Sequence, residues 1–267
     1  MAARKPPQKS RGRAPRKPAQ KSAGKSGIAQ IGPPDFAALG ADRLEALLDA
    51  GEEVVRCRRV LARSGENPIS ELLGARDFYE WDHQPPGDVC DPETLAQYFY
   101  HAHPGPTADG EHGHFHTFLR GPGMPESCRP LAGPDGAPPA DRKDAVAHLV
   151  AIGMDEFGAP VSLFTVNRWV TDETWFAAPD TIAMLDRFVV DLARPSWPVN
   201  RWITAMIDLF RPQIEALIEA RDRVVDEHAR RLGRAVYDDR SLEVTALCPI
   251  DVDAQIDAIG EALGAAG

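Results

Sequence analysis

Apolar residues recur at two spacings along this chain, and each spacing predicts one type of secondary structure. Alternating apolar and polar positions predict strands over residues 97–103, 112–119, 145–155, 161–170 and 241–249. Recurrence at every third or fourth position predicts helices over residues 35–64, 181–192, 199–210, 212–232 and 251–263, with a helical turn at 70–73. Because strands precede helices without β–α–β alternation, we expect an α+β fold, with a mainly antiparallel sheet of about five strands packed with several helices.

The first 33 residues differ sharply in composition from the rest. Residues 1–26 hold nine Lys and Arg and no Asp or Glu, which leaves 21 basic and 40 acidic residues in the remainder. Such a tract has almost nothing to bury and cannot offset the entropy of ordering, so residues 1–33 are expected to be a disordered basic tail. Residues 34–267 are expected to form a single α+β domain. The tail suits either an anionic partner or a solubilising role without a specific partner.

Charge, cysteine spacing and hydropathy argue against several protein classes. The acidic body lacks the basic face that nucleic-acid phosphates require. The four cysteines contain no C-x-x-C pair, which argues against a zinc ribbon and a thioredoxin-like redox motif. No apolar segment has the length of a signal-peptide core or a membrane span. We therefore expect a cytoplasmic protein with free thiols and no membrane partner.

Five of the eight histidines lie within sixteen residues, at His101, His103, His112, His114 and His116. Imidazole is the commonest metal ligand among protein side chains. Successive side chains of a strand point to opposite faces, so the histidines of each predicted strand share one face. If the two strands pair as a hairpin, all five imidazoles line one surface.

This surface predicts a site for a divalent transition metal, zinc or iron, built from a subset of His101, His103, His114 and His116. Glu111, at the entrance of the second strand, would complete a two-histidine, one-carboxylate ligand set. His114 and Glu111 are also the candidate catalytic residues. The alternative is a solvent-facing row of histidines, or histidines bonded to loop carbonyls, because the sequence does not say which face is buried. His148, on the next strand, is either a further member or a core residue.

Two short motifs resemble those of known families. His112-Gly-His-Phe-His-Thr-Phe resembles the histidine-triad signature of nucleotide hydrolases and transferases over about seven residues, with Gly113 at a usually apolar position. That resemblance implies a nucleophilic role for His114. His101-Ala-His103 resembles the His-x-His of cupin metal sites, although the next glutamate, Glu111, stands eight positions on.

Residues 167–175, at the end of a predicted strand, form a second segment whose side chains are suited to binding a ligand. Loops after strands commonly hold ligand contacts, and the planar guanidinium of Arg168 suits a carboxylate or phosphate. Arg168, Trp169 and Trp175 are therefore candidate substrate-binding residues. The alternative is a structural ion pair with packed indoles.

Three functions follow from these patterns, and the sequence leaves open whether the protein is an enzyme. The first is a metal-binding protein with a histidine-lined pocket for a small molecule, acting as a metal-dependent hydrolase or oxygenase. The second is a non-catalytic interaction protein that uses the acidic body and basic tail. The third is a histidine-triad-like nucleotide hydrolase or transferase.

Overall fold

The computed structural model describes residues 27–103, 110–132 and 141–266. The helices are α1 Ala41–Arg63, α2 Pro68–Leu73, α3 Arg168–Thr171, α4 Ala178–Leu185, α5 Trp197–Leu209, α6 Arg211–Leu232 and α7 Val252–Ala266. The strands are β1 Ala29–Gln30, β2 Gln84–Cys90, β3 Ala96–Ala102, β4 Gly113–Arg120, β5 Val146–Met154, β6 Pro160–Val166 and β7 Val244–Pro249. The expected α+β class is confirmed.

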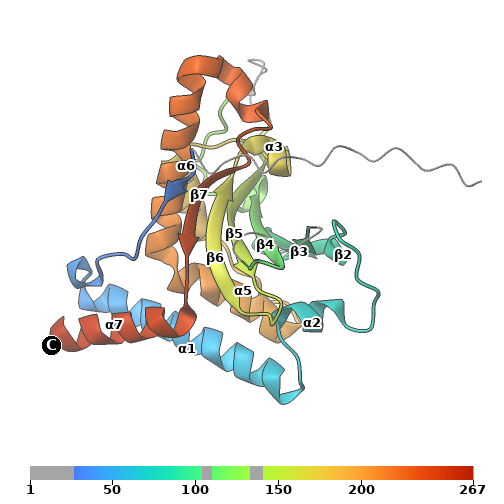
Figure 1. Ribbon diagram of the computed structural model, residues 1–267, viewed down its shortest axis with the longest axis vertical. Coiled ribbons are helices and arrows are strands. Elements are labelled where there is room, and N and C mark those ends of the chain that lie inside the picture. Colours follow the sequence, from blue (N-terminus) through green and yellow to red (C-terminus); the bar gives the residue numbers. More distant parts are fainter. Residues whose placement is uncertain (1–26, 104–109, 133–140, 267) are drawn as a thin grey trace, which may run out of the picture.

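The seven strands form one twisted sheet in the order β1-β7-β6-β5-β4-β3-β2 (Figure 1). All neighbouring strands are antiparallel except β1, which pairs in parallel with β7. The prediction of about five strands was wrong, because two edge strands have no alternating pattern. β2 begins with Gln-Pro-Pro-Gly, and β1 is two residues long.

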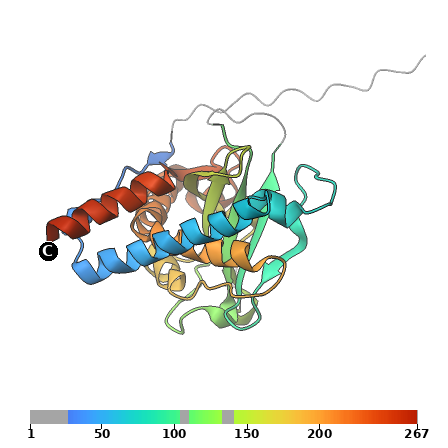
Figure 2. The same ribbon diagram turned by 90° about the horizontal axis from the view of Figure 1, so that it is seen from below.

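One face of the sheet carries the main hydrophobic core and is covered by helices. Figure 1 shows α6 beside β7, and Figure 2 shows α1 crossing beneath the sheet with α7 next to it. Tyr98 of β3 and Phe115 of β4 are fully buried on this face. The Tyr98 hydroxyl donates to Oδ1 of Asn200 at 2.5 Å, and the Phe115 ring lies 5.4 Å from that of Trp202, both partners being on α5.

Several predicted boundaries need correction for local reasons. The helix predicted to start at Asp35 starts at Ala41, because Asp35 instead caps a short 3-10 helix over Phe36–Ala38. The strand predicted to reach residue 170 ends at Val166, where the Asn167 side chain accepts from the Arg168 amide and starts α3. The helix predicted over 181–192 is α4 and ends at Leu185.

The ordered chain also begins earlier than predicted. β1 at residues 29–30 lies within the segment predicted to be disordered, and Ile31 donates its amide to the Leu247 carbonyl. Residues 1–26, which hold the basic tail, lie outside the described part of the chain. All four cysteines are free thiols, and no helix in the described part is long and apolar enough to cross a membrane.

Candidate metal centre

The sheet face opposite the helices carries the histidines. The β3–β4 register places His101 directly opposite His114 and Phe99 opposite His116. The predicted pairing of these strands is therefore confirmed, and it places His101, His114 and His116 on one face. The prediction that all five imidazoles line one surface is wrong for His112, which bonds the Tyr100 hydroxyl. This face is also shielded from solvent: His114 is 7% exposed and His116 is 1% exposed. Both faces of the sheet are thus buried at its centre, and the solvent-facing row of histidines is excluded.

Three of the imidazoles converge on one point. Nε2 of His101 lies 2.8 Å from Nε2 of His114 and 3.3 Å from Nε2 of His103. The ligand atoms of all three residues lie within 4.8 Å of one another. A tetrahedral Zn²⁺ site with Zn–N bonds of about 2.0–2.1 Å requires its nitrogens about 3.3 Å apart. Small rotations of the rings would therefore bring the three nitrogens to metal-binding distances.

Glu111 lies behind His114 rather than beside the other nitrogens. Its Oε1 lies 2.6 Å from Nδ1 of His114. A carboxylate oxygen only accepts hydrogen bonds, so Nδ1 of His114 donates to Glu111 while Nε2 faces the other imidazoles. This is the carboxylate–histidine arrangement that accompanies metal ligation in proteins. The nitrogens that converge are thus those of three histidines, and Glu111 bonds the far nitrogen of one of them.

Gly153 of β5 makes room for that carboxylate. It pairs with His114 across the sheet, and a Cβ at this position would lie 2.5 Å from Oε2 of Glu111 and 2.2 Å from Oγ of Ser162. The Ser162 hydroxyl donates to the same Oε2 at 3.4 Å. Gly153 could not be predicted as part of the site, because no local sequence pattern shows which side chains lie next to a glycine inside an apolar strand.

His116 belongs to a second, adjacent pair. Its Nδ1 lies 3.0 Å from Nε2 of His148, which is 2% exposed. A register shift between Thr117 and Phe118 inserts Leu149 as an extra residue of β5, which turns His148 toward the face of His116. The His116 ring centroid lies 4.7 Å from that of His114, so the pair extends the cluster without sharing its point of convergence.

A buried carboxylate lies behind this pair. Oε2 of Glu173 accepts the His148 amide at 2.8 Å, and the side chain is 4% exposed. Burial raises the pKa of Glu173 to about 7, against the opposing charge of Arg221. Glu173 was not singled out in the sequence, because its depth depends on how residues 171–176 fold back on β5.

Burial favours the uncharged, metal-binding form of His101, His103, His116 and His148, because it lowers their pKa values. Burial first, and then the nearby imidazoles of His114, His103 and His83, lower the pKa of His101 to about 3. Burial also lowers the pKa of His103, although Glu111 acts in the opposite direction. The pKa of His148 falls to about 3, again mainly through burial. Neutral imidazoles form a ligand set that loses few protons when a cation binds.

His112 and His83 lie at the margin of the cluster. Nδ1 of His112 lies 2.7 Å from the Tyr100 hydroxyl, so this fifth histidine of the sequence pattern turns away from the other four. His83 stacks on Phe99 with ring centroids 3.5 Å apart, and its Nδ1 lies 2.8 Å from Oδ1 of Asp88. β2, which the sequence did not reveal, holds Asp88 at that position.

The candidate substrate residues of the second stretch have partners within the fold. Arg168 pairs with Asp238 at 2.6 Å and with Asp172 at 3.3 Å. The Trp169 indole donates to the Leu242 carbonyl at 2.9 Å, and Trp175 is 4% exposed. None of the three contacts the histidines within the described part of the chain, and their role in binding a substrate stays a prediction.

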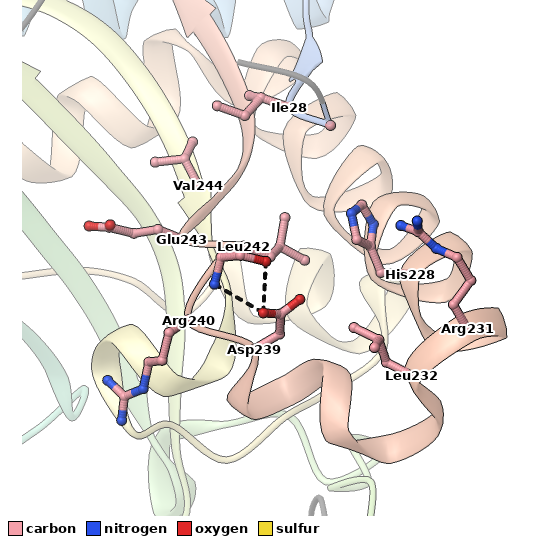
Figure 3. A pocket seen from close by; sticks show the side chains of 11 residues that line it. Ile28, His228, Arg231, Leu232, Asp239, Arg240, Leu242, Glu243 and Val244 are labelled. Carbon is pink, nitrogen blue, oxygen red and sulfur yellow. Dashed lines mark hydrogen bonds between the residues drawn. The ribbon is translucent and has the colours of Figure 1, made fainter. Parts of the chain in front are cut away.

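A separate cavity of about 650 Å³ lies beside this stretch, where the end of α6 meets the approach to β7 (Figure 3). Nδ1 of His228 donates to the Val224 carbonyl, and Asp239 accepts from the amide and hydroxyl of Ser241. The Arg240 guanidinium lies 4.3 Å over the Trp169 ring. Each of these polar groups contacts a neighbouring residue of the protein. They therefore do not form a second metal-ligand set among the described residues of this cavity.

One family model matches the part of the chain that contains the whole histidine cluster. A model described as a domain of unknown function, DUF6969, matches residues 48–250. The chain belongs to the DUF6969 family. The matched region begins within α1 and ends just after β7, so β2 to β7 lie inside it. No curated protein and no solved structure matches the chain.

Proposed function

We propose that this DUF6969 protein binds a divalent transition metal through His101, His103 and His114 and uses it in catalysis on a small molecule. The observation that carries the proposal is the convergence of one ring nitrogen from each of the three histidines, all within 4.8 Å of one another. Three histidines that leave one position open are a ligand set of catalytic zinc sites, whereas structural sites close all four positions. The ion would act as a Lewis acid or activate water or dioxygen at the open position, as in a hydrolase or an oxygenase.

Two further features support this assignment. Glu111 bonds Nδ1 of His114, which fixes the ring orientation and raises the basicity of the ligand nitrogen. The aromatic rings of Phe99 and Phe164 lie against His101 and His114 at 5.5 and 5.0 Å, and such a wall limits access of bulk water. The catalytic role predicted for Glu111 becomes an orienting role in this proposal.

The alternative nucleophilic role of His114 has less support. A phosphohistidine mechanism needs cations around the transferred phosphate, whereas the side chains that contact His114 include the His101 imidazole, the Glu111 carboxylate and the Phe164 ring. The interaction function of the basic tail concerns residues outside the described ranges and stays a prediction.

The test is elemental analysis of untagged protein purified without nickel resin, before and after incubation with Zn²⁺ or with Fe²⁺ under anaerobic conditions. We expect close to one equivalent of metal in the wild-type protein and its loss in the His101→Ala/His103→Ala/His114→Ala variant. His228→Ala and His112→Ala are matched controls that leave the three nitrogens in place and should retain the metal. Absence of metal from the wild-type protein under every condition, with the protein folded, would falsify the proposal.

A further inference from the structure

The connection between α2 and β2 places three rings against the edge of the histidine cluster. The ring pairs are Phe78 with His112 at 5.8 Å, Trp81 with His103 at 4.3 Å and His83 with Phe99 at 3.5 Å, measured between centroids. This segment therefore forms an aromatic border at the part of the cluster that β3 leaves exposed.

Trp81 is the exposed member of this border. Its indole packs against the His103 ring at an interplanar angle of 34°, and its centroid lies 6.4 Å from that of His101 in an edge-on contact. The residue is nevertheless 57% exposed. One side of the indole thus contacts a proposed metal ligand while much of the ring faces solvent. Exposing a large apolar ring has a free-energy cost that packing elsewhere would avoid.

The backbone at Trp81 is also unusual. Its φ is +73°, a left-handed conformation that bulky residues rarely adopt. The Trp81 amide donates to the Ala102 carbonyl at 2.9 Å, which fixes the loop to the end of β3. Strained backbone of this kind persists where the surrounding structure holds it, and it is concentrated at functional sites.

The accessible side of the three histidines is the side that Trp81 borders. His114 is buried, whereas His101 and His103 are partly exposed. A ligand that reaches a bound ion therefore passes His101 and His103 and meets the indole. Phe99 and Phe164 line the same face, with ring centroids 5.5 Å from His101 and 5.0 Å from His114. These aromatic surroundings suit a ligand that carries an apolar ring.

We infer that Trp81 is a ring-binding surface at the mouth of the metal centre, and that the site takes small molecules with a planar aromatic ring beside a metal-binding oxygen. This inference rests on the proposed metal centre and names the class of its ligand. Aromatic rings favour offset or edge-to-face contacts with centroids about 4.5–7 Å apart. The exposed part of the indole offers such a contact while the donor oxygen of the same molecule binds the ion.

Two probes that differ only in the ring test the inference. Benzohydroxamate and acetohydroxamate share the metal-binding group, and only the first carries a ring. Binding of each to the zinc-loaded full-length protein is measured by isothermal titration calorimetry, with the zinc content of every sample determined in parallel. We expect the wild-type protein to bind benzohydroxamate about three- to tenfold more tightly than acetohydroxamate.

The variants separate ring binding from metal binding. Trp81→Ala should reduce that preference at least threefold, with zinc content and acetohydroxamate affinity unchanged, and Trp81→Phe should keep most of it. Trp197→Ala, which removes another exposed indole at the start of α5, should match the wild-type protein.

Four results would overturn the inference. They are an unchanged ring preference in Trp81→Ala, no ring preference in the wild-type protein, no binding of either hydroxamate to zinc-loaded protein, and loss of zinc in Trp81→Ala. Loss of zinc in Trp81→Ala would mean that Trp81 holds His103 in position for metal binding and does not bind the ligand ring. A wild-type protein that takes up no zinc would instead refute the metal centre itself, so the two failures are distinguishable.

Discussion

Gly153→Ala is a one-carbon change that tests whether Glu111 holds the proposed metal ligand His114 in place. Gly153 has no left-handed φ, so alanine fits its backbone without strain. The added Cβ would lie 2.5 Å from Oε2 of Glu111 and 2.2 Å from Oγ of Ser162. Both contacts are too short, and the two side chains must move.

The displacement is large enough to break the bond to His114. Ordinary contact with a Cβ begins at 3.4 Å, so Oε2 of Glu111 must retreat by about 0.9 Å. The Oε1–Nδ1 distance of 2.6 Å would then lengthen toward the limit of about 3.2 Å for a useful hydrogen bond, or beyond it. Loss of such an outer-shell partner typically lowers metal affinity about 10- to 100-fold, which is about 1.4–2.7 kcal/mol.

The assay is a zinc titration in competition with a chromophoric chelator on wild-type protein, Gly153→Ala, Glu111→Ala and the double variant. If alanine acts through Glu111, the double variant should bind zinc no more weakly than Glu111→Ala alone, because the bond can be lost only once. Gly260→Ala in α7, where a Cβ meets nothing within 4 Å, is the matched control and should bind zinc as the wild-type protein does. Wild-type affinity in Gly153→Ala, or additive losses in the double variant, would refute the reasoning.

Three further predictions concern stability. Burial raises the pKa of Glu173 from 4.5 to about 7, so the folded protein holds an extra proton between these pH values and loses stability as the pH rises through them. In urea denaturation, Glu173→Gln should remove roughly 1–3 kcal/mol of the stability lost between pH 5 and pH 8. An unchanged pH dependence of stability in this variant would contradict the prediction. Tyr98→Phe leaves the buried Oδ1 of Asn200 without its donor and should cost about 1–3 kcal/mol in thermal unfolding, whereas an unshifted melting temperature would mean that this oxygen finds another partner. Leu149→Ala truncates the fully buried extra residue of β5 and should cost about 2–5 kcal/mol by chemical denaturation; a cost below about 1 kcal/mol would mean that the site collapses around the smaller side chain.

The elements of the fold were largely predictable because hydrophobic spacing is a local property of the chain. β3, β4, β5 and β7 lie within one to three residues of their predicted ranges, and α5 and α6 meet near Pro212 as expected. The edge strands were not predictable, because β2 and β1 are defined by their neighbours and not by an internal pattern.

For the candidate site, the sequence by itself determined that His114 and His116 share a face, since the two-residue period of a strand fixes side-chain direction. It did not show that the strand begins after His112, which therefore turns away. The tertiary structure decided which nitrogens meet. Strand register set His101 opposite His114, a bulge turned His148 toward His116, and the absence of a side chain at Gly153 left room for Glu111. It also decided that this face is buried. The register, the bulge, the space at Gly153 and the burial of this face all depend on how separate strands pack against one another. The sequence pattern of a single strand contains no information about that packing.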